Sequence, residues 1–84
     1  MARHVYVQFS AIRHFNGRCG ASAEVKAKIR AKLKELAEDP ENLGYKVPFI
    51  IPTFYQSSVG EYKIHYIFDS LELTVLYIGI LGVC

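Results

Sequence analysis

Three polar side chains in the last third of the chain have types that suit phosphodiester chemistry. Glu61, Lys63 and His65 alternate within an otherwise apolar and aromatic stretch. On a β-strand, residues at this spacing project from one face about 7 Å apart. Cleavage of RNA needs a base for the 2′-hydroxyl, an acid for the leaving oxygen and a cation for the phosphorane, so these three residues are catalytic candidates. The simpler interpretation is the water-facing side of a sheet, which alternates in the same way.

A second group of candidates is basic. Half of the ten basic residues fall between positions 26 and 34, although the net charge is only +2. A basic face of this kind attracts phosphate or an acidic partner. We therefore take Lys26, Arg30, Lys46 and Lys63 as candidate nucleic-acid-binding residues. The alternative for the helical ones is a solvated helix face, with long side-chain stems covering apolar edges.

Other chemistry finds little support in the sequence. His4 and His14 have no partners at metal-ligand spacing, and we expect both at the surface. The chain contains neither a glycine-rich phosphate loop nor a nucleophile elbow, so we expect no metal and no cofactor. Tyr55, Tyr62 and Tyr66 have rings that can stack on bases, but such tyrosines more often belong to the core.

The basic residues lie on the most strongly predicted element, a helix. Ser22 is a suitable N-cap, and Pro40 ends the helix by forcing Asp39 out of the α region. The apolar residues between them recur at helical spacing and predict one buried stripe. They are Val25, Ile29, Leu33 and Leu36. Residues 10–15 could also form a helical turn, but we expect Asn16-Gly17 and Gly20 to stop its propagation.

Alternating apolar residues predict four strands, over residues 4–9, 53–58, 61–68 and 72–80. Residues 41–52 are predicted to form a loop, and Val59-Gly60 a tight turn. In the third strand, Tyr62, Ile64, Tyr66 and Phe68 form the apolar face, opposite the catalytic candidates. The order β-α-β-β-β predicts an α+β fold, with a mostly antiparallel sheet packed on one main helix.

Size and composition place this fold in a single domain, residues 1–84. The chain is 51% hydrophobic and 21% charged, which is typical of a globular protein. Neither the number nor the spacing of Cys19 and Cys84 suggests a disulfide framework or a zinc site. The N-terminus lacks the apolar stretch of a secretory signal, and the uncharged residues 73–84 are too few to span a bilayer as a helix. We therefore expect a cytoplasmic protein with reduced thiols and no membrane association.

Several motifs, in order along the chain, resemble the RelE/ParE superfamily of type II toxins. The central one is the hairpin Val59-Gly60-Glu61-Tyr62-Lys63, where family members read Val-Gly-Asp-Tyr-Arg. Supporting segments are Val5–Ser10, which is similar to the opening strand, and Lys32–Pro40, which is similar to the end of the long helix. Tyr55, Asp69 and Tyr77-Ile78-Gly79 also match the family pattern.

This resemblance implies a toxin-like protein that a cognate antitoxin binds and neutralises. Relatives of the RelE type cut mRNA on the ribosome, and relatives of the ParE type block DNA gyrase, a DNA-processing enzyme. Gln56 and Ser58 stand where the ribonuclease branch has basic residues, and Lys63 replaces an arginine. The implied mRNA-cleavage set is thus eroded. Two alternatives remain: a non-catalytic module with a gyrase-type target, and an active, metal-independent endoribonuclease that uses Lys63 and His65 with Lys46.

The last predicted strand raises a question of assembly. The run from Leu73 to Cys84 has high β-propensity and carries no charge. If it forms an uncovered edge, it should pair with another chain. We therefore expect either a homodimer through this strand or an antitoxin segment over it.

Overall fold

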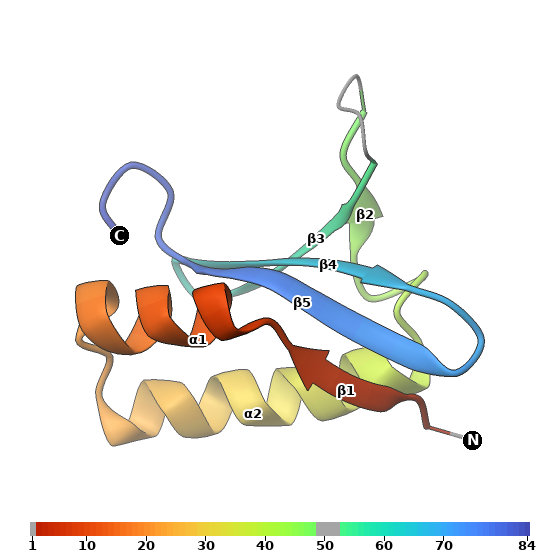
Figure 1. The fold of residues 1–84 in the computed structure, drawn as a ribbon, viewed down its shortest axis with the longest axis horizontal. Helices are drawn as coiled ribbons and strands as arrows, with labels where there is room; N and C mark the ends of the chain where they lie inside the picture. The colour runs from red at the N-terminus through yellow and green to blue at the C-terminus, as the bar shows by residue number, and fades with distance from the viewer. Residues whose placement is uncertain (1, 49–52) are drawn as a thin grey trace.

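Residues 2–48 and 53–84, which this computed structural model describes, form a sheet with helices along one side (Figure 1). In chain order the elements are β1 (His4–Val7), α1 (Phe9–His14), the π-helical turn η1 (Phe15–Cys19), α2 (Ala23–Glu38), β2 (Tyr45–Lys46), β3 (Tyr55–Val59), β4 (Tyr62–Phe68) and β5 (Glu72–Gly79). The α+β class is confirmed. α1 corresponds to the helical turn that the sequence allowed, whereas η1 and β2 were not predicted.

The described strands are arranged in the order β1-β5-β4-β3-β2. β1 runs parallel to β5, whereas β2–β3, β3–β4 and β4–β5 are antiparallel, so the prediction of a mostly antiparallel sheet is correct. A β-bulge interrupts the β4–β5 ladder between His65 and Tyr66. The predicted loop over residues 41–52 contains β2 in its described part, and residues 49–52 lie outside the described residues.

Helix α2 forms where the sequence predicts it and covers one face of the sheet. The Ser22 hydroxyl accepts a hydrogen bond from the Val25 amide at 3.2 Å, and Asp39 lies at the other end, before Pro40. Leu36 is fully buried, a contribution of about 1.5–3 kcal/mol for a side chain of this size. The same core contains further residues of α2 and the residues of β4 and β5 that face them. They are Ile29, Leu33, Ile64, Tyr66, Leu73, Val75 and Ile78.

The first helical segment is longer than predicted. Asn16-Gly17 does not stop it, because α1 continues as a π-helical turn to Cys19. The predicted stop at Gly20 is correct, since the turn ends there with a left-handed φ of 56°. Phe15 is 7% exposed at the junction of the two segments. Burial of a phenylalanine is worth about 1.5–3 kcal/mol, more than the roughly 1 kcal/mol that a glycine inside a helix costs. Tertiary packing therefore overrides the local signal.

The last strand of the described sheet is flanked on both sides, so it offers no uncovered edge through which a homodimer could pair. β1 pairs with the first half of β5, from Glu72 to Val75, and the Gln8 amide donates to the Val75 carbonyl at 3.0 Å. Beyond that point α1 lies beside β5 (Figure 1). On the other side β4 pairs along the strand. β5 is thus enclosed, as its apolar composition on both faces requires.

The tyrosines of the hairpin belong to the core, as their ordinary interpretation predicts. Tyr66 is fully buried, and its hydroxyl donates to the Pro40 carbonyl at 2.6 Å. Burial is the main cause that raises the pKa of Tyr66 to about 12, with smaller contributions from Tyr55 and Asp39. Tyr55 and Tyr62 pack against the same cluster. Tyr66 is therefore not available to stack on bases, and Tyr55 and Tyr62 keep only part of their surface exposed.

Candidate functional site

In the described part of the chain, β3, β4 and β5 present a face opposite the one that α2 covers. Ile64 and Tyr66 are fully buried on the helix side, so strand alternation turns Lys63 and His65 to this open face. The Lys63 ammonium group donates to the Ser58 hydroxyl at 3.0 Å, across the β3–β4 pair. The predicted orientation of Lys63 and His65 is therefore confirmed.

His65 is held by a chain of side-chain hydrogen bonds. Its Nε2 donates to Gln56 Oε1 at 3.0 Å, and the Gln56 amide nitrogen donates to the Tyr45 hydroxyl at 2.6 Å. Together these bonds orient the amide and place the proton of the neutral ring on Nε2, which makes Nδ1 the acceptor. Burial lowers the pKa of His65 below its ordinary value of 6.5, so the ring is neutral at pH 7.

Four rings extend from Phe54, just before β3, across the open face to α1. His65 lies 4.5 Å from the Phe54 ring and 5.0 Å from the Tyr77 ring, measured between centroids. Tyr77 in turn lies 5.2 Å from His14 of α1. We call Phe54, His65, Tyr77 and His14 the ring row. It places two imidazoles on either side of one phenol.

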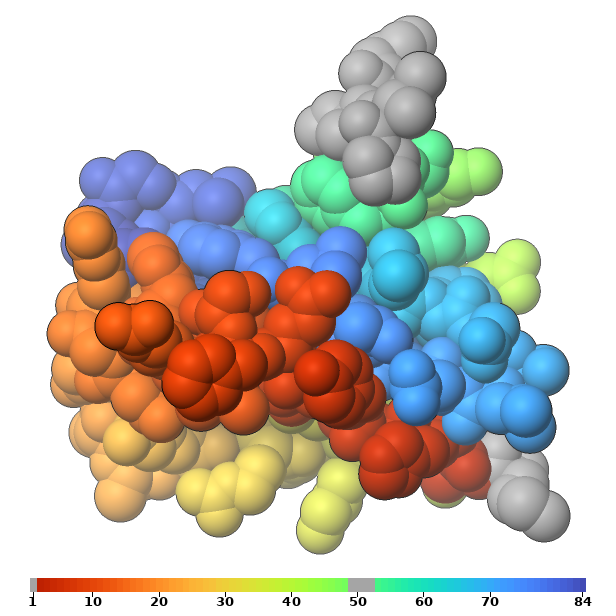
Figure 2. Space-filling model, viewed as in Figure 1, coloured from red at the N-terminus to blue at the C-terminus, as the bar shows by residue number. Residues whose placement is uncertain are grey.

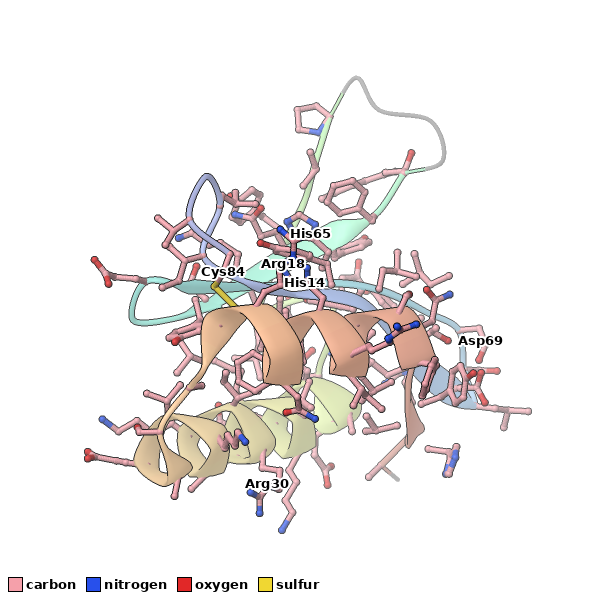
Figure 3. The ribbon with its side chains drawn as sticks, turned by 60° about the vertical axis from the view of Figure 1, so that its left-hand side comes forward. His14, Arg18, Arg30, His65, Asp69 and Cys84 are labelled. Carbon is pink, nitrogen blue, oxygen red and sulfur yellow. A yellow bond between two sulfur atoms is a disulfide. The ribbon has the colours of Figure 1, made fainter. Side chains whose placement is uncertain are left out.

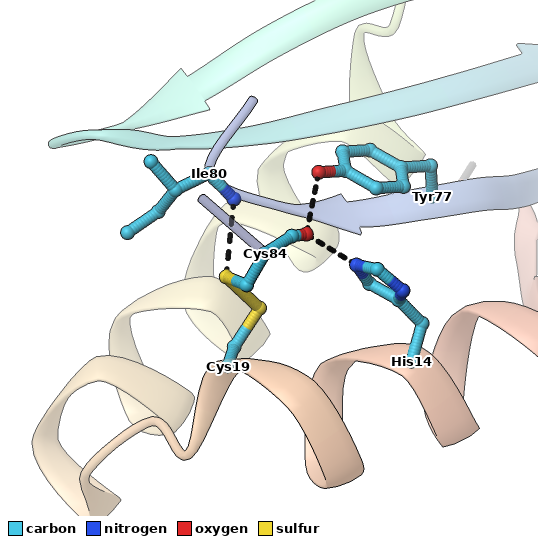
Figure 4. Close-up of a disulfide and its surroundings, with 5 residues drawn as sticks. All are labelled: His14, Cys19, Tyr77, Ile80 and Cys84. Atoms are coloured by element: carbon cyan, nitrogen blue, oxygen red, sulfur yellow. Dashed lines mark hydrogen bonds between the residues drawn. A yellow bond between two sulfur atoms is a disulfide. The ribbon is translucent and has the colours of Figure 1, made fainter. Parts of the chain in front are cut away.

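At the α1 end of the ring row, two donors meet on one oxygen atom. The main-chain oxygen of Cys84 accepts a hydrogen bond from the Tyr77 hydroxyl at 2.9 Å and another from His14 Nε2 (Figure 4). Gly79 makes room for this arrangement, because a Cβ atom there would lie 2.5 Å from both the Cys84 oxygen and the Tyr77 hydroxyl. His14 is partly exposed, as expected of a surface residue, but its ring also has a structural role that the sequence did not predict.

The segment that carries this oxygen is fixed by a disulfide, which corrects the expectation of reduced thiols. After β5 the chain turns back, with the amides of Val83 and Cys84 donating to the Ile80 carbonyl. This turn brings Cys84 to Cys19 of η1, with the two Cα atoms 5.2 Å apart, and their sulfurs are bonded. Residues 80–84, which we call the tail, pack directly on the first helical segment at the surface (Figure 2).

Glu61, the third catalytic candidate, lies apart from Lys63 and His65. β4 begins at Tyr62, so Glu61 belongs to the turn between β3 and β4. It lines a hollow of about 180 Å³ together with Val25 and Lys28 of α2. The prediction that the three side chains project together fails at Glu61, because the strand starts one residue later than the pattern indicated.

The candidate nucleic-acid-binding residues are divided between the two sides of the molecule. Lys46 is exposed on β2, at one edge of the sheet, and Lys63 is on the open face. Lys26 and Arg30 belong to α2, and Arg30 points away from the sheet and from His65 (Figure 3). These two side chains border an apolar cleft of about 210 Å³ between α1 and α2. The four residues therefore do not form one continuous surface.

His14 and Tyr77 are the site residues that sequence reasoning missed. Tyr77 sits in an apolar strand, and His14 has no partner at metal-ligand spacing. The one signal in the sequence was the pair of cysteines, because a bond between Cys19 and Cys84 brings the tail to α1.

Among the described residues, no group of three or more His, Cys, Asp or Glu side chains is arranged to hold a metal ion. In the same ranges, no helix is both long and apolar enough to cross a bilayer. A scan against protein-family models finds no match for this chain. A search of curated proteins finds no significant relative.

Proposed function

We propose that this chain is a toxin-like protein of the RelE/ParE type that acts in the cytoplasm and is neutralised by a cognate antitoxin. The sequence motifs around the hairpin are the first support for the proposal. A second support is the open sheet face opposite α2, on which Lys63 and His65 stand. The proposed target is a nucleic-acid machine, either the ribosome with its mRNA or a DNA-processing enzyme.

Two hydrogen bonds support the proposal that the mRNA-cleavage residues of the family are partly lost in this chain. Gln56 and Ser58 occupy the positions where the ribonuclease branch has basic residues, and these two side chains bond to His65 and Lys63 respectively. A neutral amide and a hydroxyl replace two charges that would otherwise contact phosphate. The open face is thus better suited to binding than to rapid cleavage.

A metal-independent endoribonuclease is the second candidate, and the state of His65 favours it. A neutral imidazole with Nδ1 as acceptor can take the proton of a 2′-hydroxyl. The 2′-oxygen would then attack phosphorus and form a cyclic phosphate, while the departing 5′-oxygen takes a proton from water. Lys63, about 7 Å along the strand from His65, would stabilise the charge on the phosphorane.

The partner surface that fits an antitoxin is the cleft between α1 and α2. Ile12, Phe15 and Leu33 line it, and the cations Lys26 and Arg30 stand at its border. An amphipathic segment with acidic flanks would bury apolar side chains there and neutralise both cations. A homodimer is a further proposal, and it would pair along β1 or β2, the edge strands of the described sheet.

Tightly controlled expression in a bacterium tests the proposal. Growth should stop on induction and recover when the open reading frame next to the gene is co-expressed. Cleaved mRNA in arrested cells, lost in His65→Ala and Lys63→Ala variants, would select the endoribonuclease. Arrest with DNA damage and unaffected variants would select a gyrase-type target. Unchanged growth with soluble, folded protein would refute the toxin proposal.

A further inference from the structure

The outer side of α1 carries a concentration of positive charge that the proposed function does not use. Arg13, His14 and Arg18 line a hollow of about 400 Å³ together with Phe9 and Ser10. η1 contributes to this arrangement, because a π-helical turn aligns residues five apart, as Arg13 and Arg18 are. Figure 3 shows Arg18 and His14 on the same side of the molecule as His65.

These two guanidinium groups are not neutralised within the described ranges. Neither Arg13 nor Arg18 forms an ion pair there, and the ion pairs present join Lys28 to Glu24 and Lys32 to Glu35. The first 23 residues of the sequence contain no aspartate or glutamate. Both arginines are exposed, so a ligand can reach them from solution. A surface of this kind favours an anion with several acceptor oxygens.

The hollow adjoins a pair of donors that already bind an oxygen atom. His14 lines the hollow and, with the Tyr77 hydroxyl, donates to the main-chain oxygen of Cys84. Two donors converging on one oxygen are suited to an oxygen of a phosphate group. In the disulfide-bonded structure the tail occupies both of them, and the Cys19–Cys84 bond holds it in place.

We propose that Arg13, His14, Arg18 and Tyr77 form a binding site for a phosphate group, and that the tail occupies the two donors of this site until the disulfide is reduced. A dithiol supplies the two electrons and two protons, the bond between the sulfurs of Cys19 and Cys84 breaks, and the dithiol becomes a disulfide. The tail then leaves its position, and His14 and Tyr77 turn to the ligand. The ring row connects this site to His65, so the backbone phosphate of single-stranded RNA is the ligand we favour.

Two probes on purified full-length protein test the site. The first is a fluorescently labelled, single-stranded oligouridine hexamer measured by anisotropy, and the second is inorganic phosphate followed by NMR of the histidine ring protons. Each is titrated into the oxidised protein and into protein kept in excess dithiothreitol. We expect the reduced protein to bind the hexamer about tenfold more tightly, because four donor side chains are then available in place of two.

Variants connect the effect to the named residues. The Cys19→Ser/Cys84→Ser variant should bind like the reduced protein without any reductant. Combining Arg13→Ala with Arg18→Ala should remove the gain and reduce the slope of log affinity against log salt by about 1.4, because each phosphate contact on a single strand contributes about 0.7. Lys34→Ala, which removes an exposed cation of α2 that belongs to none of the proposed sites, is the control and should change neither. Circular dichroism checks that each variant is folded.

The outcomes separate this inference from the toxin proposal, which is tested by growth. Phosphate binding with the same dependence on reduction and on the arginines, but no gain for the hexamer, would keep the site and assign it to a free phosphate. Equal affinity of oxidised and reduced protein for both probes would overturn the inference. So would a gain that survives replacement of both arginines, even if expression of the protein still arrests growth.

Discussion

The two faces of the β4–β5 pair are stabilised by different kinds of contact, although the same strands form both. On the face toward α2, Ile64 and Val75 are fully buried and their neighbours are apolar. On the open face, His65 and Tyr77 contact side chains of β3 and α1 and a main-chain oxygen of the tail. Burial of apolar surface stabilises the face toward α2, whereas individual polar contacts stabilise the open face.

This difference explains which parts of the molecule tolerate change. A buried apolar face loses stability whenever a side chain becomes smaller, because the surrounding structure does not close the cavity completely. An open polar face can exchange one partner for another, or for water, at little cost. We therefore expect the open face to determine function while the helix-covered face determines folding.

The largest contrast should come from two isoleucines of one strand. Ile64→Ala on the covered face should lower the free energy of unfolding by about 4 kcal/mol, because it removes a fully buried side chain and leaves a cavity. Ile67→Ala on the open face, where the side chain is 41% exposed, should lower it by less than about 0.5 kcal/mol. Urea unfolding measures both. Equal losses would mean that the open face is covered in solution.

Replacing two glycines by alanine should change stability in opposite directions. Gly79→Ala should destabilise by about 2 kcal/mol, because its Cβ would lie 2.5 Å from the Cys84 oxygen and push the tail away. Gly17→Ala should stabilise by about 0.5–1 kcal/mol, because a Cβ there meets no atom within 4 Å and alanine favours the helical conformation. Thermal unfolding of both variants under oxidising conditions gives the signs. A neutral Gly79→Ala would show that the tail is not packed as described.

Two tyrosine hydroxyls provide the next contrast. Tyr66→Phe should cost about 1.5 kcal/mol at pH 7, because the buried Pro40 carbonyl loses its donor. Tyr77→Phe should cost less, because the Cys84 oxygen keeps the bond from His14.

The pH dependence is a second readout on Tyr66. Its pKa is about 12 in the folded protein and 10.0 ordinarily, so the unfolded chain loses the proton first. Stability should therefore fall as pH rises above about 10, and this part of the fall should be missing in Tyr66→Phe. Identical alkaline curves would contradict the assignment.

The smallest effect should come from His65 on the open face. Its pKa lies below 6.5 in the folded protein, so the unfolded chain takes up a proton first as pH falls. The difference in unfolding free energy between the wild type and His65→Gln should decrease as pH drops through 6.5, and then level off below the folded pKa. Urea unfolding between pH 8 and pH 5 measures it. If the difference in unfolding free energy grew as pH falls, the pKa of His65 would be raised in the folded protein and not lowered.

Local sequence pattern was sufficient for the covered face. The spacing of Ile29, Leu33 and Leu36 predicted α2, and the alternation around Ile64 predicted which side of β4 is buried. Both patterns are enforced by burial, which acts on every residue of an amphipathic element. The orientation of Lys63 and His65 followed from the same alternation.

The arrangement of the open face could not be predicted from local sequence patterns, because it depends on contacts between distant parts of the chain. The bond between Cys19 and Cys84 joins residues 65 positions apart, and the roles of His14 and Tyr77 depend on that closure. The continuation of α1 through Gly17 depends on packing against β5. Glu61 was misplaced by a single residue at a strand boundary, the least reliable part of any such prediction.

The parallel pairing of β1 with β5 also determines the order of folding. His4 lies opposite Glu72, so the first strand to leave a ribosome finds its neighbour only after the last one has been made. Until then α2 has an incomplete surface to pack on, and the early hairpin of β3 and β4 stands without its central neighbour. Contacts so distant in sequence slow folding, because the chain must close a long loop before it gains their energy. The nascent chain therefore remains exposed to chaperones and proteases until synthesis of β5 is complete.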